Sequence, residues 1–410
     1  MSRPRAQSRE TSALRPLWLQ VYLPNLMIAT GQGAMLPVLA LAAQHVHASV
    51  SVASVIVAVN GFGTMLFDIP SGWIVARFGE LRSSRAAGLF LAIGLLGAIE
   101  AKTTLLLGVS VFIAACGWAI WSLVRLTHLS RVAPLAIRGR ALSVFGGVTR
   151  AGNVVGPFVL IAVAGSKNPH DAFLVYLVAV LVGFGWLALA RDRRDHQAMA
   201  RRLESIRPLE VVTQNKREFA TAGVGTFGIS VLRASRQAVI PLWGAHIGLD
   251  AGQISTIFGL SSIVDLSLFY PAGIVSDRFG RKMVAIPCIV ILSVGHVLLP
   301  FSHAYSSLFL VALLLGFGNG LGSGIVMTLG ADRAPDVGRA SFLAMWRLVS
   351  DAGTTAGPLI DAAAIAVLSL SLAGPIVGVV GFGSAYVVAR YMRETTGFVL
   401  PMQEREPGGG

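Results

Sequence analysis

Long apolar runs that recur along the whole chain constrain its fold more than any other feature of the sequence. A helix that crosses a bilayer needs about 20 mainly apolar residues, and twelve runs of roughly this length can be placed. They cover approximately residues 17–43, 51–76, 86–101, 104–129, 140–165, 171–190, 219–245, 252–276, 283–302, 305–330, 340–364 and 372–390. Backbone amides in lipid must bond within their own segment, which favours helices. The sequence predicts an all-α integral membrane protein with twelve transmembrane helices.

The composition argues against a soluble protein and against an enzyme. Only 13% of the 410 residues are charged and 54% are hydrophobic, whereas about a quarter of a soluble domain is charged. The sequence contains no Walker-type loop, no HExxH motif and no cysteine/histidine cluster, so we expect no catalytic activity, no metal and no cofactor. Cys116 and Cys288 lie in separate apolar runs, where a free thiol acts as a small hydrophobe.

The basic residues are distributed unequally between the two sides of the predicted membrane protein. If the N-terminus is cytoplasmic, the segments on the far side carry only Lys102 and Lys167 among all lysines and arginines. Positively charged loops stay in the cytoplasm, so we expect a multi-pass protein of the plasma (inner) membrane with both termini cytoplasmic. The net charge of +13 then reflects a basic face toward anionic lipid rather than a surface for nucleic acid.

One long polar segment, residues 191–217, separates the first six runs from the last six. Apolar side chains recur in it at helical spacing, at Met199, Leu203, Ile206 and Leu209. This pattern predicts an amphipathic helix that lies on the inner leaflet. The expected organisation is an N-terminal six-helix bundle over 1–190, the linker over 191–217, a C-terminal six-helix bundle over 218–394 and a cytoplasmic tail over 395–410.

The two halves of the chain repeat one another. PSGWIVARFGELR (70–82) matches PAGIVSDRFGRKM (271–283) at a shift of 201 positions, and RAGNVVGP (150–157) matches DAGTTAGP (351–358) at the same shift. GQGAMLP (31–37) matches SRQAVIP (235–241) at a shift of 204. Both copies begin on the cytoplasmic side and hold an even number of spans, so a pseudo-two-fold axis along the membrane normal relates the two bundles.

A charged loop after the eighth run carries the pattern G-x-x-x-D-R-x-G-R-K. With the six-plus-six repeat, it is similar to the signature loop of the major facilitator superfamily (MFS), and the resemblance covers nearly the whole chain. It implies the MFS fold and a gating or conformational role for Gly273, Asp277, Arg278, Gly280, Arg281 and Lys282, and for Gly72, Arg77 and Gly79 of the first copy. Arg281 and Lys282 are expected to hold the loop at the inner leaflet. The first copy departs from the pattern, with Ala76 in place of the aspartate and Glu80 in place of an arginine.

A second pattern, G-x-x-x-G-P at Gly152, Gly156 and Pro157, resembles the antiporter motif of the same family. Small residues one turn apart also let helices approach closely, so plain helix packing is the alternative. The resemblance implies a secondary active transporter of the bacterial multidrug or small-solute efflux kind. We expect a monomer that exports a small organic solute in exchange for protons. The alternatives are an importer or facilitator of such a solute, including an anionic one, and a membrane sensor or scaffold that transports nothing.

Ionisable residues within the runs are functional candidates because charge at membrane depth is costly. At about 1.5 Å per residue, Asp68 and Arg347 lie at similar depths, and so do Arg150 and Asp265. In the resembled fold, spans 2 and 11 face one another, as do spans 5 and 8. We therefore expect two ion pairs between the halves, Asp68 with Arg347 and Arg150 with Asp265, related by the repeat axis. They would form and break as the halves rock, with static pairing as the alternative.

Asp351 lies one helical turn beyond Arg347 and could compete with Asp68 for it. This competition makes Asp68 and Asp351 the leading proton-coupling candidates, with Asp265 third. In the resembled fold, spans 1, 4, 7 and 10 line the substrate cavity. Candidates on these spans are Asn25, Gln32, Arg125, His128, Arg233, Arg236 and Asn319. Their excess of cations predicts an anionic or zwitterionic solute, although Arg233 and Arg236 could instead pair with Asp265 or Asp351.

Overall fold

The computed structural model describes residues 18–133, 138–164, 168–189, 208–335 and 337–394, and these residues form helices and connecting turns without a strand. The first half contains η1 (Trp18–Tyr22), α2 (Leu23–Met35), η2 (Leu36–Val38), α3 (Leu39–His45), α4 (Val50–Ile99), α5 (Thr104–Val132), α6 (Arg138–Ala164) and α7 (Asp171–Leu189). The first four of these follow one another directly and together make the first span.

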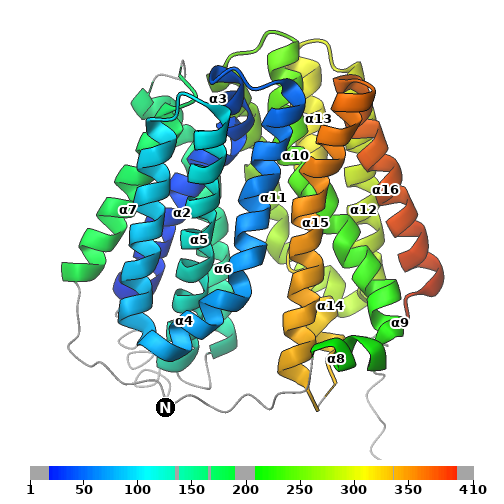
Figure 1. The fold of residues 1–410 in the computed structure, drawn as a ribbon. Helices are drawn as coiled ribbons and strands as arrows, with labels where there is room; N and C mark the ends of the chain where they lie inside the picture. Colours follow the sequence, from blue (N-terminus) through cyan, green and yellow to red (C-terminus); the bar gives the residue numbers. More distant parts are fainter. Residues whose placement is uncertain (1–17, 134–137, 165–167, 190–207, 336, 395–410) are drawn as a thin grey trace, which may run out of the picture.

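The second half begins with three short helices, α8 (Pro208–Gln214), α9 (Lys216–Glu218) and η4 (Phe219–Gly223). It continues with α10 (Val224–His246), α11 (Ala251–Phe279), α12 (Lys282–Leu298), η5 (Leu299–Phe301), α13 (Tyr305–Leu321), α14 (Ile325–Arg333), α15 (Arg339–Val367) and α16 (Leu370–Tyr391). Figure 1 shows the two halves side by side as two bundles of helices.

Glycine turns account for the difference between these helices and the twelve predicted spans. The long helix α4 contains spans 2 and 3, because Gly79 breaks it with a φ of 76°. Span 10 consists of α13 and α14, joined by a turn in which Gly324 has a φ of 84°. Eight helical stretches of the described chain are long and apolar enough to cross a membrane. Because α4 contributes two spans, α7, α10 and α15 complete the twelve.

The turns at one face of the molecule are set by side chains that cap the helices. Ser49 caps α4, Thr103 caps α5, and Asp250 caps α11 in a capping box with Gln253. Such side chains satisfy amide groups at a helix start that have no partner within the helix. We call this face, at the top of Figure 1, the upper face, and the opposite face, which carries the Gly79 and Gly280 turns, the lower face.

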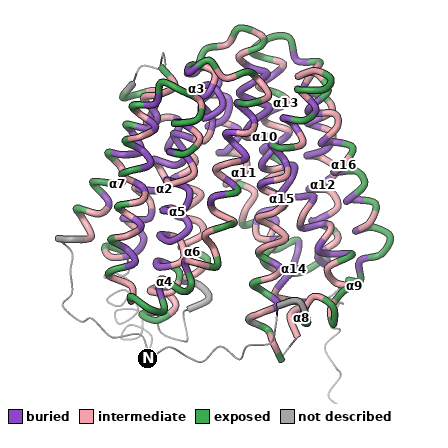
Figure 2. The backbone as a smooth tube through the Cα atoms, in the orientation of Figure 1, coloured by how far each residue is buried: buried purple, intermediate pink, exposed green. Residues whose placement is uncertain are grey.

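Each half has an apolar core, and the halves share apolar packing near the upper face. The largest cluster contains only residues from 211 to 392. A second cluster of first-half residues also includes Ala238 and Leu242 of α10. A third joins first-half side chains to Ala251 and Ile254 at the start of α11. Figure 2 shows buried residues along the inner faces of both bundles.

Polar contacts follow the same boundary between α4 and α15. The Ser51 hydroxyl donates to the carbonyl of Ala362 at 2.7 Å, and the Ser54 hydroxyl donates to the carbonyl of Pro358 at 2.8 Å. Toward the lower face these two helices diverge (Figure 1). At this boundary, α4 and α15 are thus packed together near the upper face and diverge toward the lower face.

The end of the predicted linker helix packs on the second half. Met199, Leu203 and Ile206 lie outside the described residues. Helix α8 begins at Pro208, and Val211 within it is 2% exposed and belongs to the core of the second half. The domain boundaries, and the inner-leaflet position of the linker, stay predictions.

Candidate functional site

The first ionic contact between the halves joins α4 to α15, and we call it the first bridge. Two nitrogens of the Arg347 guanidinium each lie 2.8 Å from a carboxylate oxygen of Asp68. Two-point contacts of this kind are the strongest geometry for an arginine and a carboxylate. The Asp68 side chain is 15% exposed and that of Arg347 is 44% exposed, so the bridge lies where the packed interface meets the accessible space.

Asp351 completes the first bridge from the same helix as Arg347. Its carboxylate lies 3.6 Å from the Nε atom of Arg347. Two carboxylates thus share one guanidinium, and one of them faces it from the other half. A proton on either carboxylate would redistribute the attraction between the halves.

The second bridge joins α6 to α11 and to the turn before α14. The Arg150 guanidinium donates to the Ser323 hydroxyl and lies 3.8 Å from Asp265. Ser323 in turn donates to Asp265 at 3.1 Å, and Asn319 donates to the other oxygen of Asp265 at 2.5 Å. Arg150 therefore reaches the carboxylate both through space and through the hydroxyl.

The two bridges lie on equivalent helices but not on equivalent residues, which corrects the expectation that the repeat axis relates them. At the 201-residue shift, Asp68 corresponds to Phe269 rather than to Asp265. The Arg150 guanidinium stacks over that Phe269 ring, 4.7 Å from its centroid. Arg150 itself corresponds to Asp351. The contact between Arg150 and Phe269 thus occupies the positions equivalent to Asp351 and Asp68, with different chemistry.

Three predicted cavity residues of the second half lie close to the second bridge. Arg233 donates to the backbone carbonyl of Asn319 at 3.1 Å. Arg236 is 4% exposed and donates to Ser261 at 2.5 Å, with its guanidinium over the Phe258 ring. The Nε atoms of Arg233 and Arg236 are buried and have no hydrogen-bond partner in the described part of the chain. Neither arginine forms the ion pair with Asp351 that we considered.

The first half holds its own buried polar group around Asn25. Asn25 donates to Thr149 at 2.7 Å and accepts from the Trp121 indole at 3.3 Å. The Arg125 guanidinium lies over the Trp121 ring and donates to Ser84 at 2.7 Å. Gln32 is buried in α2, 9% exposed. Asn25, Gln32 and Arg125 are thus interior residues of the first half.

His128, which we expected in the substrate cavity, instead belongs to the turn at the lower face. Its Nδ1 atom lies 2.8 Å from Glu80, and Arg131 forms an ion pair with the same carboxylate. Arg77 and Trp73, from the same turn, form a cation–π contact at 6.0 Å. His128 therefore ties α5 to the Gly79 turn.

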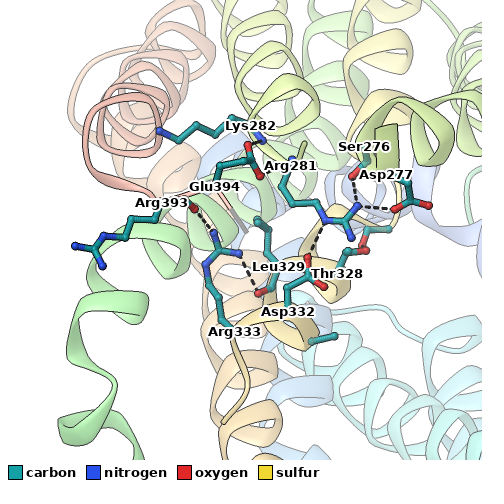
Figure 3. A network of polar contacts seen from close by, with 12 residues as sticks. Ser276, Asp277, Arg281, Lys282, Thr328, Leu329, Asp332, Arg333, Arg393 and Glu394 are labelled. Atoms are coloured by element: carbon teal, nitrogen blue, oxygen red, sulfur yellow. Dashed lines mark hydrogen bonds and ion pairs between the residues drawn. The ribbon is translucent and has the colours of Figure 1, made fainter. Parts of the chain in front are cut away.

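The signature loop of the second half is held by a network around Arg281 (Figure 3). Its Nε donates to Asp332 at 2.7 Å, and its Nη1 donates to Asp277 at 2.5 Å and to Ser276 at 3.0 Å. Burial on its own would lower the pKa of Arg281, but the bonds to Asp332 and Asp277 outweigh it and raise that pKa above its ordinary value. Arg281 is fixed as a cation between α11 and α14.

Glu394 closes the same loop from the end of α16. Its two carboxylate oxygens accept the backbone N–H groups of Arg281 and Lys282 at 2.8 and 3.0 Å. A side chain at Gly280, whose φ is 100°, would collide with that carboxylate. Lys282 donates to the carbonyl of Ala389 at 3.1 Å. The Arg281 side chain is thus buried among protein groups rather than directed at lipid, and the inner-leaflet role of Lys282 stays a prediction.

The remaining motif residues occupy the open sides of the two turns. The ring of Phe279 lies 5.4 Å from the Arg278 guanidinium. A side chain at Gly72 or at Gly273 would meet no other group. These glycines are therefore not required by packing within the chain in this arrangement.

The G-x-x-x-G-P motif occurs in both halves and brings helices into close contact. A Cβ on Gly152 would lie 2.6 Å from Ala29, and a Cβ on Gly156 would collide with the backbone of α2. In the second half, a Cβ on Gly353 would lie 2.6 Å from the carbonyl of Phe227 in α10. Spans 5 and 11 thus pack on spans 1 and 7 in the same manner, and Pro157 and Pro358 follow at equivalent places.

Several residues of these networks were not among the candidates predicted from the sequence. Arg131, Asp332 and Glu394 lie at span ends, where a charged residue is unremarkable by composition. The signal for Arg131 and Asp332 is the repeat itself, since Arg131 lies 201 positions before Asp332. Asp361, fully buried in α15, was detectable as a carboxylate within an apolar run. No group of three or more His, Cys, Asp or Glu in the described residues could hold a metal ion.

Comparisons with known proteins agree with this architecture. The sequence matches the Major Facilitator Superfamily over residues 21–231 and 222–401. Among curated proteins, the Bacillibactin exporter of Bacillus subtilis (strain 168) is 33% identical over 67 residues, which cover 16% of this chain and 17% of that protein. The match thus spans about a sixth of the exporter's length.

Solved structures of similar fold include transporters of different solutes. A mutant of the nucleoside transporter NupG aligns with a TM-score of 0.76 and 13% identity over 92% of this chain and 100% of that chain. A POT family transporter in complex with a thioalcohol-conjugated peptide has a TM-score of 0.74 and 14% identity, over 92% and 95%. The D-xylose-proton symporter has a TM-score of 0.69 and 17% identity, over 93% and 99%.

Twelve spans in two repeated bundles, and a family match that covers both halves, lead to one conclusion. This chain is a multi-pass membrane transporter that belongs to the Major Facilitator Superfamily.

Proposed function

We propose that this transporter exports a small organic solute by alternating access, with protons moving in the opposite direction. The lower face is cytoplasmic in this proposal, and the arrangement described above is open toward the cytoplasm. A monomer in the plasma (inner) membrane carries out the whole cycle. The observation that carries the proposal is the first bridge, in which Asp68 and Asp351 share Arg347 across the boundary of the halves.

The position of the two bridges suits a device that opens and closes. Both join helices of different halves, the first through Asp68 and Arg347 and the second through Arg150 and Asp265. Removing one member of a fully buried ion pair costs about 3–5 kcal/mol, and these partly exposed pairs cost less, although an intact pair adds little net stability. Such a pair therefore changes the balance between two arrangements more than it stabilises either one.

The first bridge contains two carboxylates and one guanidinium, and this excess of acidic groups favours coupling to protons. When both carboxylates are ionised, one guanidinium serves two negative charges, and a proton relieves this imbalance. Arg347 could then remain with one carboxylate while the other is neutral. Asp68 and Asp351 are the first candidates for the coupled proton, and Asp265, which faces Arg150 and Asn319, is the third.

The direction of transport rests on two observations. The G-x-x-x-G-P motif resembles that of antiporters in the family, and a short part of the chain is similar to the Bacillibactin exporter. The symporter among similar folds makes import the second candidate. The cations at and near the second bridge, Arg150, Arg233 and Arg236, favour an anionic or zwitterionic solute.

Transport by everted membrane vesicles tests direction, coupling and charge preference together. Vesicles containing the protein are energised by a pH gradient, acid inside, and given an anionic dye (carboxyfluorescein) or a cationic dye (ethidium). We expect the gradient to drive accumulation of the anionic dye, and a protonophore to abolish it. In vesicles that contain the Asp68→Asn variant, the rate of dye accumulation should fall at least about ten-fold, which corresponds to roughly 1.4 kcal/mol.

Each alternative gives a different result in the same assay. An importer would release preloaded dye from everted vesicles when the gradient is applied. A sensor or scaffold would leave every dye, of either charge, distributed as in vesicles without the protein. Accumulation of the cationic dye alone would contradict the proposed substrate charge but not the export direction.

A further inference from the structure

Asp361 is a buried carboxylate that takes no part in either bridge. It lies in α15, about 9 Å below the upper end of that helix at Val367, and its residue is 0% exposed. One oxygen accepts a hydrogen bond from the Ser235 hydroxyl of α10 at 3.0 Å. The other oxygen is buried and has no hydrogen-bond partner in the described part of the chain.

The helices that pack against α15 bring no cation to this carboxylate. On α4, the hydroxyls of Ser51 and Ser54 face this part of α15 and donate to its backbone carbonyls, and residues 50–67 of α4 contain no charged side chain. Residues 370–389 of α16 contain none either. Both η4 and α14 meet α15 around Trp346, far below Asp361.

The ionisable groups of α10 are engaged elsewhere. Arg236 donates to Ser261 of α11, and Arg233 donates to the carbonyl of Asn319. The His246 ring, at the upper end of α10, lies against Trp243 with ring centroids 5.1 Å apart. Asp361 forms no ion pair with any described residue, so its only fixed partner is the serine hydroxyl.

An ionised carboxylate without a cation is costly in such surroundings, whereas a neutral carboxylic acid is not. A neutral carboxylic acid also has an O–H group, so the oxygen that lacks a partner can donate a hydrogen bond. The fold does not require an acid here, because the equivalent residue of the first half is Leu160, which is 3% exposed in an apolar cluster. The carboxyl group therefore needs a reason other than packing.

We propose that Asp361 is a proton-binding site, and that its carboxyl group must be neutral for the upper ends of α4 and α15 to close. This proposal rests on the alternating access proposed above. When the upper face opens, Ser51 and Ser54 leave α15, and water from that side reaches the carboxyl group. Asp361 ionises in the open arrangement, and a proton taken up from the upper side accompanies each closure.

Infrared spectroscopy of the purified protein tests the protonation directly. Near neutral pH, wild type should show the carbonyl stretch of a protonated carboxylic acid that is protected from exchange in D₂O. Asp361→Asn, which keeps the shape of the neutral acid, should lose this band. Asp361→Leu copies the first half and should lose it as well, which provides a second variant if the amide is tolerated poorly.

A matched control separates Asp361 from other carboxyl groups. Asp250 is an exposed helix cap at the same face, and Asp250→Asn should leave the band unchanged. A band that is identical in wild type and in both Asp361 variants would overturn the proposal. This readout involves no solute, so it is independent of export, import and coupling.

A cross-link at the upper face tests the connection between protonation and closure. Cysteines in place of Ser51 and Ala362, which touch across the boundary, can be joined by a short bis-maleimide linker. The band should persist at alkaline pH in the linked protein and disappear in the unlinked one. Identical titration of both would overturn the connection. If the band behaves as expected while no pH gradient drives dye, the Asp361 site stands and the export proposal fails.

Discussion

Glu80 and Arg281 occupy equivalent positions of the internal repeat, 201 residues apart, and carry opposite charges. Each forms an ion pair with a residue at the end of the span two further along, Glu80 with Arg131 and Arg281 with Asp332. Those partners are themselves 201 residues apart and also opposite in charge. The contact between the turn and the neighbouring helix is thus present in both halves with its polarity inverted.

This inversion predicts that the polarity of the pair in the first half can be exchanged. Glu80→Arg alone places a second arginine beside Arg131 and removes the partner of His128, and should lower the free energy of unfolding by about 1–2 kcal/mol, since the site is partly exposed. Adding Arg131→Asp reproduces the polarity of the second half and should restore most of the loss. Thermal unfolding of the purified single and double variants in detergent measures both effects.

Glu100 provides the control for this exchange, because it is an exposed acid at the opposite end of α4. Glu100→Arg should leave the unfolding temperature nearly unchanged. If the double variant is no more stable than Glu80→Arg alone, the two halves do not use interchangeable contacts.

The close approach of α2 and α6 predicts a steric effect at Gly156. A methyl group there would collide with backbone atoms of Ala34 and Gly33, and backbone cannot move aside as a side chain can. Gly156→Ala should cost about 1–3 kcal/mol of stability. Gly147→Ala on the same helix meets open space and should be neutral or stabilising. Equal yields of folded protein from the two variants would argue against tight packing at this motif.

The shifted pKa of His170, a residue at the upper face, predicts that the free energy of unfolding depends on pH. Burial lowers the pKa of His170 from its ordinary value of 6.5; the backbone bond to Ala42 raises it, and the neighbouring His45 lowers it again. The folded protein therefore favours the neutral ring, and its stabilising contribution is complete above the unfolded value of 6.5. That contribution is lost progressively as the pH falls from 6.5 through the lower pKa of the folded state, because the unfolded chain binds the proton more readily.

Thermal unfolding across this pH range checks the effect. The decrease in unfolding temperature on acidification should be smaller in His170→Gln than in wild type. His303→Gln, which removes an exposed histidine of the same face, controls for the loss of a ring. A decrease of the same size in wild type and His170→Gln would refute the assignment.

The spans and the bridge partners could be predicted because both depend on spacing along helices. Runs of apolar residues locate the spans, and a rise of about 1.5 Å per residue places Asp68 near the depth of Arg347. The internal repeat fixes which spans are equivalent. Which helices face one another was implied by the resemblance to the family, and the structure places the Arg347 guanidinium 2.8 Å from Asp68.

Side-chain direction could not be predicted in the same manner. His128 lies on a cavity-lining span by position, yet its ring turns toward Glu80 at the lower face. Arg281 and Lys282 have the composition of a lipid-facing loop, yet they bind Asp332, Glu394 and a backbone carbonyl. Which partner a flexible cation selects depends on residues far apart in the sequence, such as Asp332 for Arg281, that no local pattern connects.

We expect the first bridge to favour the arrangement that is closed at the upper face. Spin labels can report on the lower face, on cysteines that replace Arg82 of α4 and Val337 before α15, both exposed. The native Cys116 and Cys288 are buried, so labelling is confined to the introduced sites. Double electron–electron resonance then gives the distribution of distances between the halves.

Asp68→Asn removes one partner of Arg347 across the boundary. The distribution should then move toward shorter distances, because the lower face closes as the upper face opens. Asp68→Arg combined with Arg347→Asp reverses the charges and should return the distribution to that of wild type. A distribution that is the same in wild type, in Asp68→Asn and in the exchanged pair would contradict the claim, and would leave the bridge as a static contact between the two halves.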